Sequence, residues 1–239
     1  MAESASDADL FLETAGTLLA IMFLSAPVPQ VYPLHSMPEK INSVNPASIL
    51  ALHANCAAQV IYGLYMPVPA AVPANLFGLV ASLYYLSTCW YSAFCLDTLK
   101  SGAWNRSAAL ATIVTLSISL AMLLYTAFQL HPNAAEHVGN VALVFNVCLF
   151  AAPLSSLRTV FRNKSSELLP VLPSLLGLLC SGCWCYIGRR HESKPLWVPN
   201  SLGFLLSSIQ VMLICIFPSK KVKTMAEDLP HSVDVKEKT

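Results

Sequence analysis

The stretch PANLFG at residues 73–78 decides the fold, because it returns 125 residues later as VPNSLG at residues 198–203. Two further matches occur in the same order at nearly the same offset, namely Ala26-Pro27-Val28 with Ala152-Pro153-Leu154, and Tyr62-Gly63 with Tyr186-Ile-Gly188. Self-similarity at a fixed period is the sequence signature of a repeat architecture. We therefore predict two copies of one structural unit.

Composition places both copies in a membrane. The 239 residues are 55% hydrophobic and 11% charged, with a mean hydropathy of +0.58, whereas soluble domains carry about 25% charged residues. Apolar helices of about 20 residues cross a hydrocarbon core about 30 Å thick, and a charge at a helix centre would cost about 2.5–3.5 kcal/mol. Spans without a central charge are predicted near residues 14–34, 47–66, 73–95, 108–130, 138–161, 170–188 and 197–217.

The span 108–130 has no counterpart in the repeat, and its role is topological. Three helices that start on one side of a membrane end on the other, so one additional crossing makes the second copy parallel to the first. We predict an all-α membrane protein with seven transmembrane helices, in which two parallel three-helix bundles are joined by a linker helix (3+1+3). The expected divisions are an extracytosolic segment at 1–13, the first repeat at 14–95, the linker helix and its loops at 96–137, the second repeat at 138–217, and a cytosolic tail at 218–239.

The basic residues predict the orientation, because cytosolic loops carry an excess of Lys and Arg. With the N-terminus outside, the outer side receives only Arg189, Arg190 and Lys194. The cytosolic side receives Lys40, Lys100, Arg106, Arg158, Arg162, Lys164, Lys220, Lys221, Lys223, Lys236 and Lys238. We therefore expect an extracytosolic N-terminus and a cytosolic C-terminus.

The spans offer little to a catalyst. They contain no pair of Asp or Glu residues and no HExxH motif, whereas an enzyme needs positioned acids, bases or nucleophiles. His53 is interpreted as packed or hydrogen-bonded between helices in preference to a proton relay. The CxxCxC run at 180–185 lacks a nearby histidine, so its cysteines are interpreted as apolar packing residues. We expect no enzyme activity, cofactor, metal or nucleic-acid partner.

Two asparagines, Asn75 and Asn200, occupy equivalent positions in the two copies. A carboxamide offers two donors and an acceptor, which suits sugar hydroxyls, and it places no charge in the membrane. Repeat-built transporters bind substrate at the interface of their repeats, which favours a binding role. The alternative is that both residues join helices through hydrogen bonds, and the residues alone leave both roles open.

A second pair, Gln59 and Trp184, also lies one repeat offset apart. An indole face can cover the apolar face of a sugar ring while an amide adds hydrogen bonds, although core packing or an aromatic belt would also explain the tryptophan. Prolines form a third set, which suggests hinges because proline removes a backbone hydrogen bond. The hinge candidates are Pro27, Pro46, Pro153 and Pro170.

Taken together, these residues resemble the SWEET sugar transporter family within the PQ-loop superfamily. The segments that carry the resemblance are APVPQVY at 26–32, NCAAQVIYGL at 55–64, PANLFG at 73–78, APLSSLRTVFRNKSSELLP at 152–170, LCSGCWCYIG at 179–188 and VPNSLGFLLSSIQ at 198–210. The likeness extends from about residue 14 to 217. It implies a uniporter that lets mono- or disaccharides run down their gradient by alternating access.

The resemblance also assigns roles to individual residues. Asn75, Asn200 and Trp184 are similar to the family's sugar site, with Gln59 in the corresponding place of the first copy. The resemblance implies that Cys180 bears on sugar choice, that Leu149 lines the same cavity, that Tyr62 is the outer gate, and that the four prolines are the hinges. Gln59 and Cys180 depart from the residues expected there, and Pro46 stands two residues before the usual proline position.

Two rival functions remain at this point. The dipeptide Pro29-Gln30 also fits a PQ-loop transporter of another solute, such as an amino acid, but the proton-coupled members carry an intramembrane carboxylate that these spans lack at depth. A seven-helix receptor would explain the helix count but not the repeat. We expect a small sugar and membrane lipid as partners, and the sequence leaves a homo-oligomer open. The plasma membrane is the expected location, with Golgi and vacuolar membranes as alternatives.

Overall fold

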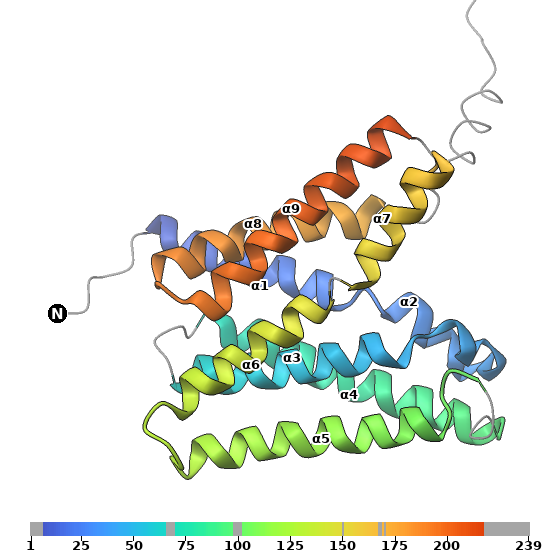
Figure 1. Cartoon of the computed structure of the whole chain (residues 1–239), viewed down its shortest axis with the longest axis horizontal. Coiled ribbons are helices and arrows are strands. Elements are labelled where there is room, and N and C mark those ends of the chain that lie inside the picture. Colours follow the sequence, from blue (N-terminus) through green and yellow to red (C-terminus); the bar gives the residue numbers. More distant parts are fainter. Residues whose placement is uncertain are drawn as a thin grey trace, which may run out of the picture.

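The computed structural model describes residues 7–65, 70–97, 102–149, 151–166, 169 and 171–217, and this part of the chain is built from helices (Figure 1). The elements are α1 (Asp7–Leu24), α2 (Val28–Val31), η1 (Tyr32–His35), η2 (Pro38–Ser43), α3 (Pro46–Tyr65), α4 (Ala71–Cys95), α5 (Arg106–Ala127), α6 (Ala134–Leu149), α7 (Ala151–Asn163), α8 (Val171–Arg190) and α9 (Lys194–Ile216). The all-α prediction is confirmed.

The predicted spans match these helices, with two differences. Six helical stretches among the described residues are long and apolar enough to cross a membrane. The remaining predicted span, 138–161, is covered by α6 and α7, and residue 150 between them lies outside the described residues. The first span begins earlier than predicted, since α1 starts at Asp7, and its regular part stops at Leu24.

Packing between the helices repeats across the two copies. Helices α3 and α4 pack together as α8 and α9 do, and α1 contacts α4 as α6 contacts α9. The copies meet through α1 against α8 and through α6 against α3, which are equivalent pairs. Helix α5 packs on α3 and α6 and completes the bundle (Figure 1). The arrangement is therefore the predicted 3+1+3, with the two repeats side by side.

Local chemistry explains where several helices begin. Asn105 caps α5, because its Oδ1 accepts from the N–H groups of Ser107 (2.9 Å) and Ala108 (3.2 Å). Asn45 Oδ1 accepts from Ala47 N–H at 3.0 Å at the start of α3. Pro46 is the first residue of that helix, a position at which proline costs no helical hydrogen bond.

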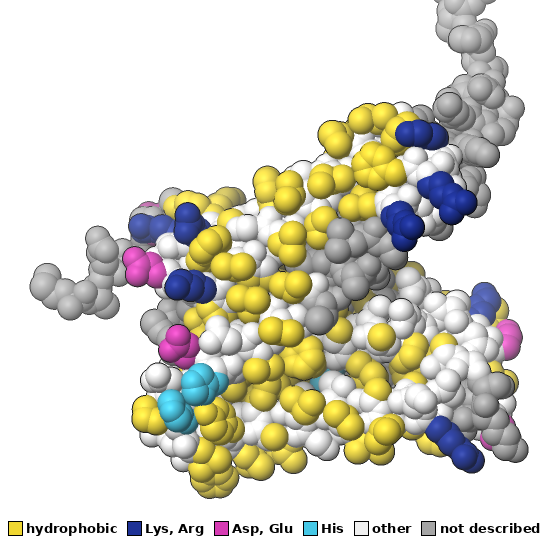
Figure 2. Space-filling model, in the orientation of Figure 1, with side chains coloured by type: hydrophobic (Ala, Val, Ile, Leu, Met, Phe, Trp, Pro, Cys, Tyr) yellow, Lys and Arg dark blue, Asp and Glu magenta, His cyan; other side chains and the backbone are white. Residues whose placement is uncertain are grey.

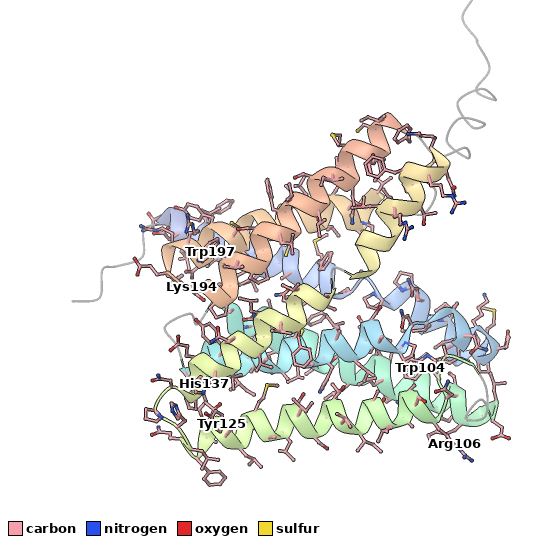
Figure 3. The ribbon with its side chains drawn as sticks, viewed as in Figure 1. Trp104, Arg106, Tyr125, His137, Lys194 and Trp197 are labelled. Atoms are coloured by element: carbon pink, nitrogen blue, oxygen red, sulfur yellow. The ribbon has the colours of Figure 1, made fainter. Side chains whose placement is uncertain are left out.

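The two ends of the bundle differ in the residues they hold. Tyr125 and His137 lie at the same end as Lys194 and Trp197, whereas Trp104 lies at the opposite end (Figure 3). The loops predicted outside the membrane therefore share one end, called here the outer end. On the face shown in Figure 2, charged side chains gather at the two ends and apolar or uncharged side chains cover the middle, as a membrane requires.

Several polar and sulfur groups inside the helices are buried. His53 is 3% exposed and its Nδ1 forms a 3.0 Å hydrogen bond with Ser82 Oγ of α4. Cys56, Cys89 and Cys180 are buried as free thiols, and within the described ranges no group of three potential ligands could hold a metal. Cys148 has a side chain outside the described ones.

Candidate substrate-binding cavity

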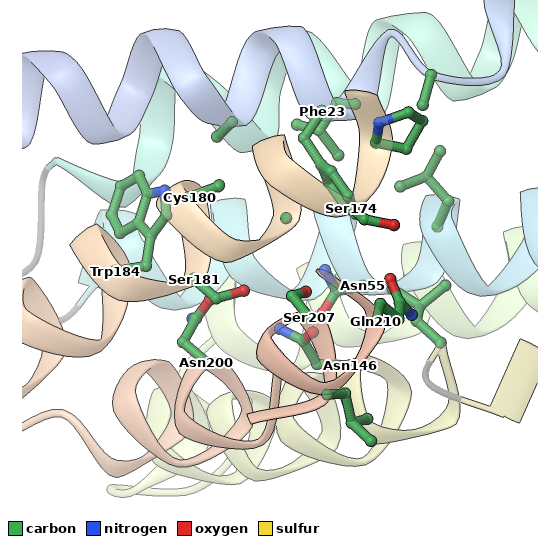
Figure 4. Close-up of a pocket in the computed structure, with 18 of the residues that line it drawn as sticks. Phe23, Asn55, Asn146, Ser174, Cys180, Ser181, Trp184, Asn200, Ser207 and Gln210 are labelled. Atoms are coloured by element: carbon green, nitrogen blue, oxygen red, sulfur yellow. The ribbon is translucent and has the colours of Figure 1, made fainter. Parts of the chain in front are cut away.

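A cavity of about 540 Å³ lies between the two repeats. Its walls come from α1, α3 and α4 of the first copy and from α6, α8 and α9 of the second, and none of the described residues that line it is charged. The polar side chains in the lining are Gln30, Asn55, Gln59, Asn75, Asn146, Ser174, Ser181, Asn200, Ser207 and Gln210. Figure 4 shows several of them around one space, with Trp184 on α8 to one side. Such a surface offers neutral hydrogen-bonding groups.

The predicted asparagine pair meets in this cavity. Asn75 Nδ2 donates to Ala71 O at 2.8 Å, and Asn200 Nδ2 donates to Leu196 O at 2.7 Å. Ala71 and Leu196 are themselves 125 residues apart, so the two carboxamides are held in the same way by their own helices. Each carboxamide keeps one N–H and its oxygen for another partner.

The α3 wall presents two buried amides one helical turn apart. Asn55 is 7% exposed and Gln59 is 2% exposed, and Asn55 Oδ1 and Gln59 Oε1 accept no hydrogen bond from the described part of the chain. Gln59 Nε2 lies 3.5 Å from Pro195 O, a carbonyl that lacks its usual helical donor because Pro199 has no N–H. Buried polar atoms without a partner are rare in native proteins. The two oxygens are therefore candidate acceptors for a bound molecule.

The α8 wall is apolar at the positions equivalent to these amides. Cys180 stands 125 residues after Asn55, and Trp184 stands 125 residues after Gln59. Trp184 is 5% exposed and donates from Nε1 to Gly16 O of α1 at 3.1 Å. Its indole is therefore fixed in place by the other repeat, and the two walls of the cavity differ in polarity.

The outer end of the cavity is closed by contacts between the repeats. Tyr62 is 3% exposed, and its hydroxyl forms a 2.9 Å hydrogen bond with Ser193 Oγ in the α8–α9 turn. A Cβ at Gly139 would lie 2.5 Å from Tyr62 Cδ2, so glycine makes room for the ring. Further out, Arg190 and His191 contact the α1 carboxylates Asp9 and Glu13, at 3.1 and 3.2 Å respectively.

The opposite end is open to solvent. The lining extends to Gln30 of α2, which is exposed, and to Pro173 and Gln210 near the same end of α8 and α9. Helices α2 and α7 diverge there (Figure 1). Under the orientation expected from the basic residues, this end faces the cytosol.

The remaining predicted residues fall in different places. Leu149 lines the cavity as the last residue of α6. Pro27 lies in the break between α1 and α2, Pro46 starts α3, and Pro153 is the third residue of α7, with its side chain outside the described ones. Pro170 lies outside the described residues.

Asn55 is the cavity residue that the sequence reasoning missed. The repeat offset could have indicated it, because position 55 lies 125 residues before Cys180. The polar lining residues Asn146, Ser174, Ser181 and Ser207 were not predicted either, because nothing in a single sequence distinguishes them from residues that join helices.

Two parallel three-helix repeats around one uncharged cavity define the architecture of a repeat-built membrane transporter. Residues 136–222 match the family model described as a sugar efflux transporter for intercellular exchange. Over that stretch the chain is similar to this family.

Relatives over longer stretches agree with this assignment. The chain is 29% identical over 168 residues to the bidirectional sugar transporter SWEET1a of Sorghum bicolor, covering 70% of this chain and 61% of the relative. It is 26% identical to SWEET7 of Arabidopsis thaliana, covering 89% of this chain and 81% of the relative, and 27% identical to NEC1 of Petunia hybrida, covering 91% and 80%. Both of these are also named bidirectional sugar transporters.

A solved structure of a eukaryotic SWEET transporter has the same fold. It superposes with a TM-score of 0.72 at 21% identity, covering 87% of this chain and 96% of the other. The described architecture is thus shared along nearly the whole of that protein.

Proposed function

We propose that this protein carries a small sugar, a mono- or disaccharide, across its membrane by facilitated diffusion with alternating access. The observation that carries the proposal is the cavity between the repeats, whose lining combines amides and hydroxyls with one fixed indole and no charged residue among those described. Sugars present hydroxyls at their edges and apolar C–H groups on their faces, which such a lining matches. The relatives are named bidirectional sugar transporters, which supports the same chemistry here.

The proposed site consists of Asn75, Asn200, Trp184, Gln59, Cys180 and Leu149, to which we add Asn55. The two asparagines would bind hydroxyls from both repeats, the α3 amides would accept from others, and Trp184 would cover an apolar face. Tyr62 would act as the outer gate, because it links α3 to the α8–α9 turn.

Alternation would follow from relative movement of the two repeats. The described state is closed at the outer end by the Tyr62–Ser193 contact and open at the Gln30 end, so the proposed cycle breaks the outer contacts while α2 and α7 approach each other. We propose Pro27, Pro46, Pro153 and Pro170 as the places where the helices bend. No carboxylate belongs to the described lining, which favours uncoupled transport over proton coupling.

We place the protein in the plasma membrane with its N-terminus outside, as the positive-inside count and the family description of intercellular exchange favour. Uptake of radiolabelled glucose, fructose and sucrose in a hexose-transport-deficient host tests the function. Asn75→Ala and Asn200→Ala should each abolish uptake at equal surface expression, because each removes a hydrogen-bonding side chain from the cavity. Asn163→Ala is the matched control, since Asn163 is an exposed residue at the end of α7.

Three results would contradict the proposal. Normal uptake in both asparagine variants would show that the cavity is not the sugar path. Uptake that requires a pH gradient would show proton coupling, and uptake of amino acids without sugars would favour another PQ-loop solute.

A further inference from the structure

The first transmembrane crossing is broken between α1 and α2 (Figure 1). Pro27 has no N–H, and Val28 donates its N–H to Ser25 O at 2.9 Å, three residues back. In a continuous α-helix, Val28 would donate to Leu24 O, four residues back. The break therefore deprives the Leu24 carbonyl of its helical donor.

Tyr85 of α4 supplies a replacement donor. Its hydroxyl donates to Leu24 O across 3.2 Å, and the side chain is 1% exposed. Irregular backbone inside a membrane protein persists where a neighbouring group satisfies the freed polar atoms. A single side chain thus compensates for the break.

Helix α4 also holds the Leu24 side chain. A Cβ at Gly78 would lie 2.6 Å from Cys56 Sγ and 3.0 Å from Leu24 Cδ1, so glycine at this position leaves room for both side chains. Gly78 and Tyr85 lie two turns apart on α4. Together they fix the last residue of α1, so that movement is left to α2 on the other side of Pro27.

We propose that Tyr85 is a positioning residue for alternating access, because its hydroxyl and the Val28 N–H compete for the Leu24 carbonyl. With Tyr85 as donor, the crossing is broken and the cavity is open at the Gln30 end, as observed. With Val28 as donor, α1 and α2 join into a straighter helix, and α2 moves relative to the mouth of the cavity. This inference rests on the proposed transport function, to which it adds the residue that sets the balance of the two states.

Tyr85 does not belong to the cavity lining. Its effect on transport must therefore pass through the α1–α2 break and not through contact with a sugar.

The second repeat holds related residues at the same offset. Leu149 stands 125 residues after Leu24, Gly203 corresponds to Gly78, and Gln210 corresponds to Tyr85. The two copies thus share the leucine and the glycine, whereas the residue at the donor position differs. Tyr85 belongs to the first repeat alone.

The test is Tyr85→Phe, which removes the hydroxyl and keeps the ring. Membrane-impermeant maleimide is applied in the absence of sugar to either face of the membrane, in right-side-out and inside-out vesicles. Labelling of Cys180, a native thiol of the cavity wall, is followed by mass spectrometry. The ratio of the rates from the two sides reports the ratio of inward-open to outward-open protein, and Cys180→Ser establishes that the signal comes from this thiol.

Tyr85→Phe should lower the inward-to-outward labelling ratio about 2- to 10-fold, the effect of one hydrogen bond on a two-state equilibrium. Tyr91→Phe is the matched control, because Tyr91 is an exposed tyrosine on the same helix, and its ratio should equal that of the wild type. In Pro27→Ala, residue 27 regains its N–H and the straight helix is favoured, so this variant should lower the ratio on its own. A purely structural role for Tyr85 would not make Tyr85→Phe and Pro27→Ala shift the ratio in the same direction.

Equal ratios for Tyr85→Phe and Tyr91→Phe would overturn the inference. If Tyr85→Phe fails to fold, Pro27→Ala alone decides, since it should lower the ratio in the same direction and an unchanged ratio contradicts the competition. The labelling needs no sugar. A shifted ratio in a protein that carries no sugar would therefore refute the transport proposal and leave the role of Tyr85 standing.

Discussion

Replacing Gln59 by leucine should stabilise the empty protein and weaken sugar binding. In the structure Gln59 is 2% exposed, its Oε1 has no partner within the described chain, and its Nε2 makes only a 3.5 Å contact with Pro195 O. Leucine has a similar size, so the substitution removes an unpaired polar group without opening a large space. Burying such a group costs about 1–3 kcal/mol.

The effects on stability and on sugar affinity have opposite signs, and the energy of one hydrogen bond sets the size of each. We expect the empty Gln59→Leu protein to gain about 1 kcal/mol, which raises the melting midpoint by about 2–4 °C for a chain of this length. The bound state loses one hydrogen bond and leaves a sugar hydroxyl unpaired, so affinity should fall by about 1–2 kcal/mol, or about 5- to 30-fold.

The assay uses protein purified in lipid nanodiscs. Melting midpoints are measured without sugar, and binding is measured by calorimetry with the sugar that the uptake experiment identifies and with its monodeoxy analogues. One deoxy analogue should bind the wild type weakly, and Gln59→Leu should cause no further loss of affinity for it. That analogue identifies the sugar hydroxyl that the Gln59 amide contacts. Ser92→Ala is the control, because Ser92 Oγ is buried but already donates to Thr88 O at 3.0 Å; it should lower the midpoint and leave affinity unchanged. A lower midpoint with unchanged affinity in Gln59→Leu would refute the reasoning.

Three further predictions concern the contacts around the cavity. Tyr62→Phe removes the bond to Ser193 and should reduce the outer-closed population about 2- to 10-fold, measured as slower labelling of Cys180 from the inner face. Gly139→Ala places a methyl group 2.5 Å from the Tyr62 ring, so it should destabilise the same closed state by about 1–3 kcal/mol, and an unchanged labelling rate would contradict that. Ser82→Ala leaves His53 without its buried partner and should lower the free energy of unfolding by about 1–3 kcal/mol, checked by urea titration in detergent, with Ser87→Ala, an exposed serine on the same helix, as the neutral control.

The repeat offset alone predicted a large part of the structure. It placed Asn75 and Asn200 at equivalent positions, and both line one cavity with the same internal hydrogen bond. It also implied the parallel arrangement in which α1 meets α8 as α6 meets α3. Such inferences succeed because the two copies fold in the same way. Two residues at equivalent places in the repeat therefore lie at equivalent positions about the axis that relates the copies.

Features that depend on partners distant in sequence were not predictable. Asp9 and Glu13 of α1 contact Arg190 and His191, which lie about 180 residues away in the sequence. Local hydropathy registers Asp9 and Glu13 only as two acidic residues, so the predicted span excludes them.

Some positions are matched between the copies and others differ. Gly78 and Gly203, and Asn75 and Asn200, are matched. At the cavity wall the copies diverge, because α3 offers the amides of Asn55 and Gln59 where α8 offers Cys180 and Trp184. A symmetric wall would bind a sugar equally in two orientations related by the axis. With acceptors on one side and an indole on the other, one orientation pairs hydroxyls with oxygens and the reverse orientation leaves those oxygens facing C–H groups. Unpaired oxygens cost about 1–3 kcal/mol each, so the asymmetric wall should select a single pose of the sugar. Exchanging Gln59 and Trp184 in one double variant should therefore restore part of the binding that either single exchange removes.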